Sequence, residues 1–293
     1  MSLEIRAHET SRSFEVFQDL MPYRVQDILL VSSLHDSFTL QEEGRLNELL
    51  LGEFLKLSLQ QIPGLTHVSS GAAALARAQA ERRFNLILTT INLGDMDAAQ
   101  LASAVRESDL DTPVVVLAYD NNERKQFVAR RSTSEIERIF LWQGNPRILV
   151  AITKYVEDKR NVEHDTKTVG VPVILLVEDN VRYYSSFLPT IYTELILQSE
   201  RLISEGVNLS HKLVRMRARP KILLCSTFEE AWELFGAHEQ HILGVVSDIE
   251  FPRGGSWSAA AGLDLAREIK RSWPDIPALL QSSRPENAAT AGA

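Results

Sequence analysis

The length, composition and charge of the chain narrow its class before any motif is considered. Its 293 residues suit two domains of about 100 to 150 residues each, and the balance of 44% hydrophobic and 24% charged residues excludes a largely disordered or fibrous chain. The net charge of −8 argues against direct binding to nucleic acid, and no apolar stretch reaches the roughly 18 to 20 residues of a membrane span. The single cysteine, Cys225, excludes a disulfide framework and fits a reducing cytoplasm, where we expect the protein to be located.

Short apolar runs alternate with amphipathic segments along the chain. Runs of this length are typical of buried parallel strands, and the segments between them have the period of helices. Strand-length runs lie at residues 28–31, 86–88, 114–117, 174–177, 222–224, 244–246 and 278–280, and helical segments at 71–82, 98–107, 228–237 and 260–271. The alternation predicts an α/β protein with doubly wound parallel sheets.

The two halves of the chain resemble each other, which indicates that one fold is used twice. Matching segments are DILLVSS and VILLVED, NLILTTINL and LGVVSDIEF, and DTPVVVLAY and DIPALLQSS. The expected organisation is an N-terminal extension at residues 1–24, a first domain at 25–160, a linker at 161–171 and a second domain at 172–293. The polar run at residues 157–168 is interpreted either as part of that linker or as the end of the first domain's last helix.

Carboxylates end two apolar strands of the second half. Glu178 and Asp179 follow the strand at residues 173–177, and Asp248 ends another strand. Because the carboxyl ends of parallel strands share one edge of a sheet, we expect these three side chains to lie together. Such a cluster is tolerated around a hard divalent cation, so the sequence predicts a Mg²⁺ site completed by the backbone carbonyl of Glu250.

Ser282 extends this pattern to a pocket that can accept a phosphoryl group. It ends a third strand, where its hydroxyl can bond an anion held at the same edge. Phosphoryl transfer needs a carboxylate nucleophile, a metal ion and hydrogen-bond donors around the phosphoryl oxygens. Asp248 is the nucleophile that this arrangement predicts.

On these residues the second half resembles the receiver domain of two-component response regulators. Glu178 and Asp179 match the family's acidic pair, Asp248 its phosphoacceptor and Ser282 its switch hydroxyl, and residues 248–252 (DIEFP) match its acceptor loop. The resemblance implies two flavodoxin-like receiver domains, bound Mg²⁺, and a histidine kinase or phosphotransfer protein as phosphoryl donor. A weaker resemblance links elongated receiver pairs of this kind to N-terminal regions of phosphoenolpyruvate-synthase-like proteins.

The second half departs from the receiver pattern in two ways. The family carries a lysine at the end of its fifth strand, whereas few residues follow Ser282, so we expect the second domain to lack that strand and its lysine. An enlarged helical insertion is also expected after the first strand, at residues 181–217, with Pro189 as a candidate kink. This arm is our candidate contact for a homodimer or between the two domains, the alternative being a long helix packed only on its own domain.

The first half keeps the apolar strands but lacks the charged groups. The residues at the corresponding positions are all uncharged: Ser32, Ser33, Thr90, Ala118 and Gln143. Such side chains cannot hold Mg²⁺ or accept a phosphoryl group by the same route, so a pseudo-receiver with a binding role is expected. Asp95 and Asp97 fall in the loop after the strand, where turn-forming Asp is common, and we do not expect them to replace the missing ligands.

Three functions compete on this sequence. The leading one is a signalling receiver that accepts a phosphoryl group on Asp248, with the first domain as a non-phosphorylated interaction module and no enzyme activity beyond its own phosphotransfer. The second is a purely structural scaffold. The third is a Mg²⁺-dependent phosphatase of the haloacid dehalogenase type, ranked last because Glu250 stands where that family has a second Asp.

Overall fold

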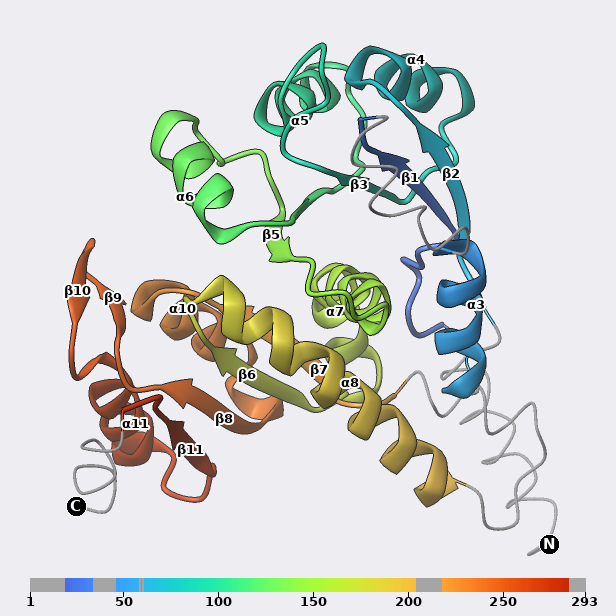
Figure 1. Ribbon diagram of the computed structural model, residues 1–293. Helices are drawn as coiled ribbons and strands as arrows, with labels where there is room; N and C mark the ends of the chain where they lie inside the picture. Colours follow the sequence, from blue (N-terminus) through green and yellow to red (C-terminus); the bar gives the residue numbers. More distant parts are fainter. Residues whose placement is uncertain (1–18, 34–45, 58, 60, 204–217, 285–293) are drawn as a thin grey trace, which may run out of the picture. The chain divides into compact units, whose positions relative to one another are not determined.

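The computed structural model describes residues 19–33, 46–57, 59, 61–203 and 218–284. These residues divide into two compact units, which we name unit N and unit C. Unit N consists of Arg24–Val156 and Val181–Tyr192, and unit C of the described residues within Met1–Tyr23, Glu157–Asn180 and Thr193–Ala293. Each unit is built on one parallel sheet with helices packed on it, which confirms the predicted α/β class (Figure 1).

The sheet of unit N has five parallel strands in the order β2-β1-β3-β4-β5, the order of the flavodoxin-like fold. The strands are β1 (Asp27–Val31), β2 (Gly64–Val68), β3 (Leu86–Thr89), β4 (Val114–Ala118) and β5 (Arg138–Leu141). The helices are α3 (Leu46–Lys56), α4 (Gly71–Glu81), α5 (Ala98–Glu107) and α6 (Asn121–Arg130). The three central strands are buried almost throughout, because their side chains are apolar on both faces.

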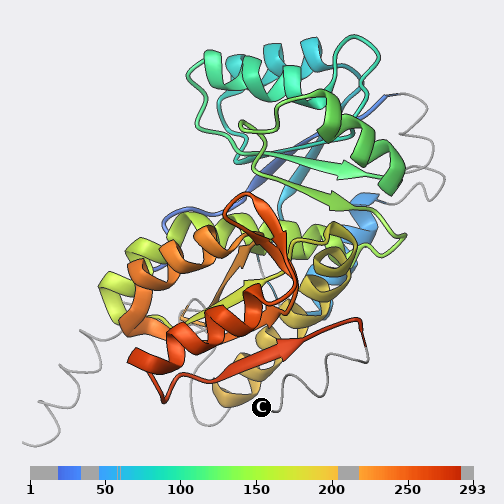
Figure 2. The ribbon, with the colours of Figure 1, turned by 90° about the vertical axis from the view of Figure 1, so that its left-hand side faces the viewer.

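The sheet of unit C has four parallel strands in the order β11-β8-β6-β7 (Figure 2). The strands are β6 (Val173–Val177), β7 (Lys221–Cys225), β8 (Ile242–Asp248) and β11 (Ala278–Gln281), and the helices are α10 (Phe228–His238), η1 (Glu239–His241) and α11 (Ala261–Ser272). This order reproduces the first four strands of unit N. Over the residues that the structure describes, this sheet has four strands.

A hairpin that the sequence analysis did not predict follows β8. It pairs β9 (Phe251–Arg253) with β10 (Ser256–Ser258) across a two-residue loop. Both loop residues, Gly254 and Gly255, have positive φ, which two-residue hairpin turns of this hand require. The Arg253 guanidinium fixes the hairpin, since it lies over the Phe228 ring and pairs with acidic side chains of α11.

Helix α7 (Arg147–Val169) contains the polar run that was interpreted as a linker or a helix end. The run at residues 157–168 is helical and belongs to unit C, whereas residues 147–156 of the same helix belong to unit N. Three of its polar side chains, those of Asp158, Asn161 and Asp165, are fully buried, because each has partners within unit C. This polar stretch is therefore part of the protein interior, where its side chains have hydrogen-bond and ion-pair partners, and is not a solvated linker.

Helix α8 (Val181–Ile203) forms the described part of the predicted insertion, whose residues 204–217 lie outside the described part of the chain. Pro189 lies inside the helix and does not end it. The first half of α8 packs on β5 within unit N: the Ser185 hydroxyl accepts a hydrogen bond from Leu141 N at 3.0 Å, and the Tyr184 hydroxyl donates to the carbonyl of Ile139. No helix among the described residues is long and apolar enough to cross a bilayer.

Candidate metal site

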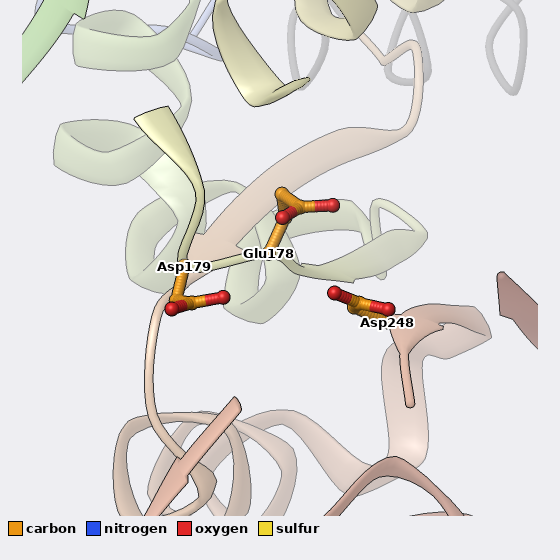
Figure 3. A group of neighbouring side chains, drawn as sticks. All are labelled: Glu178, Asp179 and Asp248. Atoms are coloured by element: carbon orange, nitrogen blue, oxygen red, sulfur yellow. The ribbon is translucent and has the colours of Figure 1, made fainter. Parts of the chain in front are cut away.

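The structure brings the three predicted carboxylates together at one edge of the unit C sheet. Glu178 and Asp179 directly follow β6, and Asp248 ends the neighbouring strand β8. Each side chain offers one carboxylate oxygen, and these oxygens all lie within 4.8 Å of one another (Figure 3). Glu178 is buried while the two aspartates are half-buried, so the cluster faces an accessible rim.

The environment of Glu178 opposes its ionisation. Burial raises its pKa to about 8, and the negative charges of Asp248 and Asp179 act in the same direction. Hydrogen bonds from Asn180 N and from the side chain of Gln281 partly offset this effect. A carboxyl group held in this way should lose its proton to solvent when a divalent cation binds, because the ion offsets the repulsion from the neighbouring carboxylates.

Asp248 is perturbed in the same sense. Burial raises its pKa, and the nearby charge of Glu250 adds to the shift, whereas backbone N–H groups and the charge of Arg284 oppose it. The Ile249 N–H donates to Asp248 Oδ1 at 2.7 Å and orients the carboxylate. The donor set is therefore all oxygen, which is the kind of ligand that Mg²⁺ prefers.

A glycine positions the loop that carries Asp248. Gly262, in the first turn of α11, donates its N–H to the Ile249 carbonyl at 3.0 Å. A Cβ atom at position 262 would lie 2.0 Å from the Asp248 carbonyl oxygen. Only glycine permits this approach of helix to loop without displacement, so it fixes where the acceptor carboxylate leaves the sheet.

The other two predicted site residues, Ser282 and Glu250, lie at the same edge, and both contact Arg284. Ser282 follows β11, is exposed, and its hydroxyl accepts a hydrogen bond from Arg284 N at 3.1 Å. The side chain of Glu250 is largely buried, and its Oε1 lies 3.2 Å from Arg284 Nη1. The switch role of the Ser282 hydroxyl and the metal-ligand role of the Glu250 carbonyl remain predictions.

Two residues of this neighbourhood, Gln281 and Arg284, were not predicted from the sequence. Gln281, the last residue of β11, pairs in register with Asp248 and donates from Nε2 to Glu178 Oε2 at 3.2 Å. Arg284 approaches the acceptor loop through Glu250. A signal existed for both, since they flank Ser282 at a strand end where polar side chains face the ligand edge.

In unit N the positions that correspond to the site hold uncharged residues such as Ser32 and Thr90, and the nearby carboxylates of Asp95 and Asp97 bond the backbone. Asp95 accepts hydrogen bonds from Gly71 N and Ala72 N, both at 2.9 Å, at the start of α4. Asp97 forms the capping box of α5. Among the described residues, no group of three metal-ligating side chains other than Glu178, Asp179 and Asp248 is close enough to hold an ion.

Comparisons with known proteins name no family for this chain. No family model and no curated protein matches the chain. Solved structures that resemble it include signal receiver domains. One is the signal receiver domain of an HD domain-containing protein from Pseudomonas fluorescens Pf-5, which is 20% identical, covers 49% of this chain and 94% of its own, and has a TM-score of 0.34. Another is a two-component system response regulator/GGDEF domain protein, 13% identical over 91% of this chain and 96% of its own, with a TM-score of 0.33.

Proposed function

We propose that unit C is a receiver module that accepts a phosphoryl group on Asp248 from a histidine kinase or phosphotransfer protein. The observation that carries the proposal is the gathering of Glu178, Asp179 and Asp248 at the carboxyl edge of a parallel sheet, with oxygens within 4.8 Å. This is the edge at which α/β sheets bind ligands. Such a protein regulates by its state of phosphorylation and is not an enzyme with a turnover of its own. The role implies a cytoplasmic location, where the donor is accessible.

The chemistry needs little covalent machinery. A carboxylate oxygen of Asp248 attacks the phosphorus of the donor phosphohistidine, the O–P bond forms as the P–N bond breaks, and the leaving imidazole nitrogen takes up a proton from water. Glu178, Asp179 and Asp248, with the carbonyl of Glu250, would hold Mg²⁺, which when bound neutralises charge on the phosphoryl oxygens. Ser282 would then turn toward the acyl phosphate and change the adjoining surface.

Unit N is proposed to act as a pseudo-receiver that binds partners without accepting phosphate. Its support is the neutral edge around Ser32 and Thr90, together with the use of Asp95 as a helix cap. A homodimer through the arm at residues 181–217 also remains a proposal. It would use the exposed face of α8, which includes Phe187, because Tyr184, Leu188, Tyr192 and Ile196 of that helix are buried within the chain.

Beryllofluoride, a mimic of the phosphoryl group on an aspartate, tests the proposal. With Mg²⁺ present, binding is measured by ¹⁹F NMR on the wild type and on Asp248→Asn, and intact-mass spectrometry follows labelling by a small-molecule phosphodonor. We expect the wild type to bind the mimic and to gain one phosphoryl group, and the variant to do neither. Equal binding by both proteins, or by neither, would contradict the role of Asp248. Turnover of a phosphate ester would favour the phosphatase, and inertness in every assay the structural scaffold.

A further inference from the structure

Arg284 lies on the loop that follows β11, beside the proposed acceptor. Its Nη1 atom is 3.2 Å from Oε1 of Glu250, two residues beyond Asp248 in the chain. The register of the sheet explains this proximity: Gln281 pairs with Asp248, so the residues after both strands leave the same edge. The side chain of Arg284 is 58% exposed, whereas that of Glu250 is 9% exposed, so the arginine has room to move while its partner is fixed.

The charge balance at this edge calls for a cation. A phosphoryl group adds about −1.5 to −2 charges to a site that already holds Glu178, Asp179 and Glu250. One divalent ion cannot neutralise that sum. A guanidinium group can neutralise part of the remaining negative charge. Its planar N–H donors match the phosphoryl oxygens, and the group is charged at physiological pH.

We propose that Arg284 is the phosphoryl-binding cation of this site, exchanging its ion pair with Glu250 for the oxygens of the group on Asp248. The inference rests on the proposed phosphoacceptor function and adds a specific residue to it. It also places the cation on the loop after the fourth strand of the sheet, next to Ser282, where the Arg284 N–H already bonds the serine hydroxyl. Both residues would then respond to the same phosphoryl group.

The positive charge of Arg284 already acts on the acceptor in the unmodified protein, where it opposes the raised pKa of Asp248. Because the effect is electrostatic, it predicts different changes in anion and cation affinity, which a purely structural role of Arg284 would not produce. Removing the charge should weaken binding of an anion at Asp248 and leave the binding of a cation there unchanged or stronger. If Arg284 only held the Glu250 loop in place, its loss would weaken both.

The test measures two affinities on the full chain: Mg²⁺ alone, and beryllofluoride at saturating Mg²⁺. The variants are Arg284→Gln, the charge-conserving Arg284→Lys, and Arg271→Gln, which makes the same charge change at an exposed position of α11. We expect Arg284→Gln to bind beryllofluoride at least about tenfold more weakly with undiminished Mg²⁺ affinity. Arg284→Lys should recover part of the loss, and Arg271→Gln should match the wild type.

The outcomes separate this inference from the function on which it rests. If the wild type binds beryllofluoride and Arg284→Gln binds it equally well, the role of Arg284 is overturned and the phosphoacceptor function stands. A parallel loss of Mg²⁺ affinity in Arg284→Gln would also overturn it, in favour of loop support. If the wild type itself does not bind beryllofluoride, both proposals fail.

Discussion

Lys221 Nζ lies 2.7 Å from Asp165 Oδ2, and both side chains are fully buried. Next to this pair, Arg219 makes two hydrogen bonds to Asp158, at 2.8 and 3.0 Å. Lys221 begins β7, and the two aspartates belong to α7, so the four charges join that helix to the edge strand of the unit C sheet. Burial lowers the pKa of Lys221, although Asp158 and Asp165 oppose the shift. The group is neutral in sum and depends on every member being present.

Replacing Lys221 by methionine should destabilise unit C strongly. The substitution keeps much of the side-chain volume but leaves Asp165 as a buried carboxylate without its cation, which costs about 3 to 5 kcal/mol. Urea unfolding followed by tryptophan fluorescence measures the loss. In a Trp142→Phe background the signal comes from Trp232, Trp257 and Trp273, all in unit C.

The control for this prediction is Lys167→Met. Lys167 also pairs with a carboxylate of α7, that of Glu163, at 2.6 Å, but both side chains are exposed. Solvent screens such a pair, so no measurable change is expected. A double variant, Lys221→Met with Asp165→Leu, should regain part of the stability because no charge is then left unpaired. Equal midpoints for Lys221→Met and Lys167→Met would refute the account.

The stability of the metal-free protein should depend on pH through Glu178. Its pKa of about 8 in the folded state exceeds the ordinary value of 4.5, so the folded protein holds the proton more tightly than the unfolded chain. The corresponding stabilisation is complete below the unfolded pKa and is lost as the pH rises from about 4.5 to about 8. Urea midpoints of the wild type should fall over this interval more steeply than those of Glu178→Gln. Superimposable pH profiles would count against the raised pKa.

Binding of Mg²⁺ should show the opposite trend. The ion requires the ionised carboxylate, so its apparent affinity for the wild type should increase with pH until about pH 8 and then level off. Titration calorimetry at several pH values measures this slope together with the proton released on binding. A flat affinity across neutral pH would show that Glu178 is already ionised without metal.

Gln281→Leu should weaken Mg²⁺ binding without unfolding unit C. The amide of Gln281 donates to Glu178 and favours its ionised form, so its loss raises the pKa of Glu178 further. At neutral pH the affinity for Mg²⁺ should fall about three- to tenfold and recover at higher pH. Gln240→Leu, at an exposed position of the same unit, is the matched control. A loss that persists at high pH would indicate a steric effect instead.

Gly262→Ala should weaken Mg²⁺ binding, whereas Gly236→Ala should stabilise the protein. The new methyl group at position 262 would meet the Asp248 carbonyl, so the acceptor loop or α11 must shift, and Mg²⁺ affinity should fall by at least about tenfold. Gly236 lies in α10 with open space around it, and alanine there should stabilise the helix by about 0.5 to 1 kcal/mol. Thermal unfolding and Mg²⁺ titration of both variants provide the comparison. Unchanged Mg²⁺ affinity in Gly262→Ala would contradict the close approach.

Neighbouring serines on α8 offer a paired test of its packing on β5. Ser185→Ala removes the acceptor of the buried Leu141 N–H and should destabilise unit N by about 1 to 3 kcal/mol. Ser186 is exposed, and its alanine variant should change stability little. Fluorescence of Trp142, the one tryptophan of unit N, reports the transition in a background without the other three. Equal stability of the two variants would show that the helix does not contribute through this contact.

Much of the fold could be predicted because the central strands are buried on both faces and read as apolar runs. The cluster of three carboxylates could also be predicted, because these residues end the apolar runs of β6 and β8. The strand β2 was missed, since this edge strand is only partly buried and carries His67 and Thr66 among its residues. The hairpin escaped notice because each of its strands has three residues, too few for a period to show.

The polar interior of α7 could not be read from the sequence for a different reason. A run of charged residues normally indicates solvent exposure, and the partners that reverse this meaning lie far away in the chain. Asp158 meets Arg219, and Asn161 bonds the backbone of Tyr23. Gln281 and Arg284 flank the predicted Ser282, but their partners Glu178 and Glu250 follow only from the register that sets β11 against β8.

Because α7 continues without a break from Arg147 to Val169, the repeated sequence and the folded unit C begin at different residues. The sequence repeat begins near Val173, yet a recombinant fragment cut there would leave the cations at the start of β7 without their carboxylates. A fragment that begins at Arg147 keeps them. Dissection of this protein should therefore follow the helix and not the border of the sequence repeat.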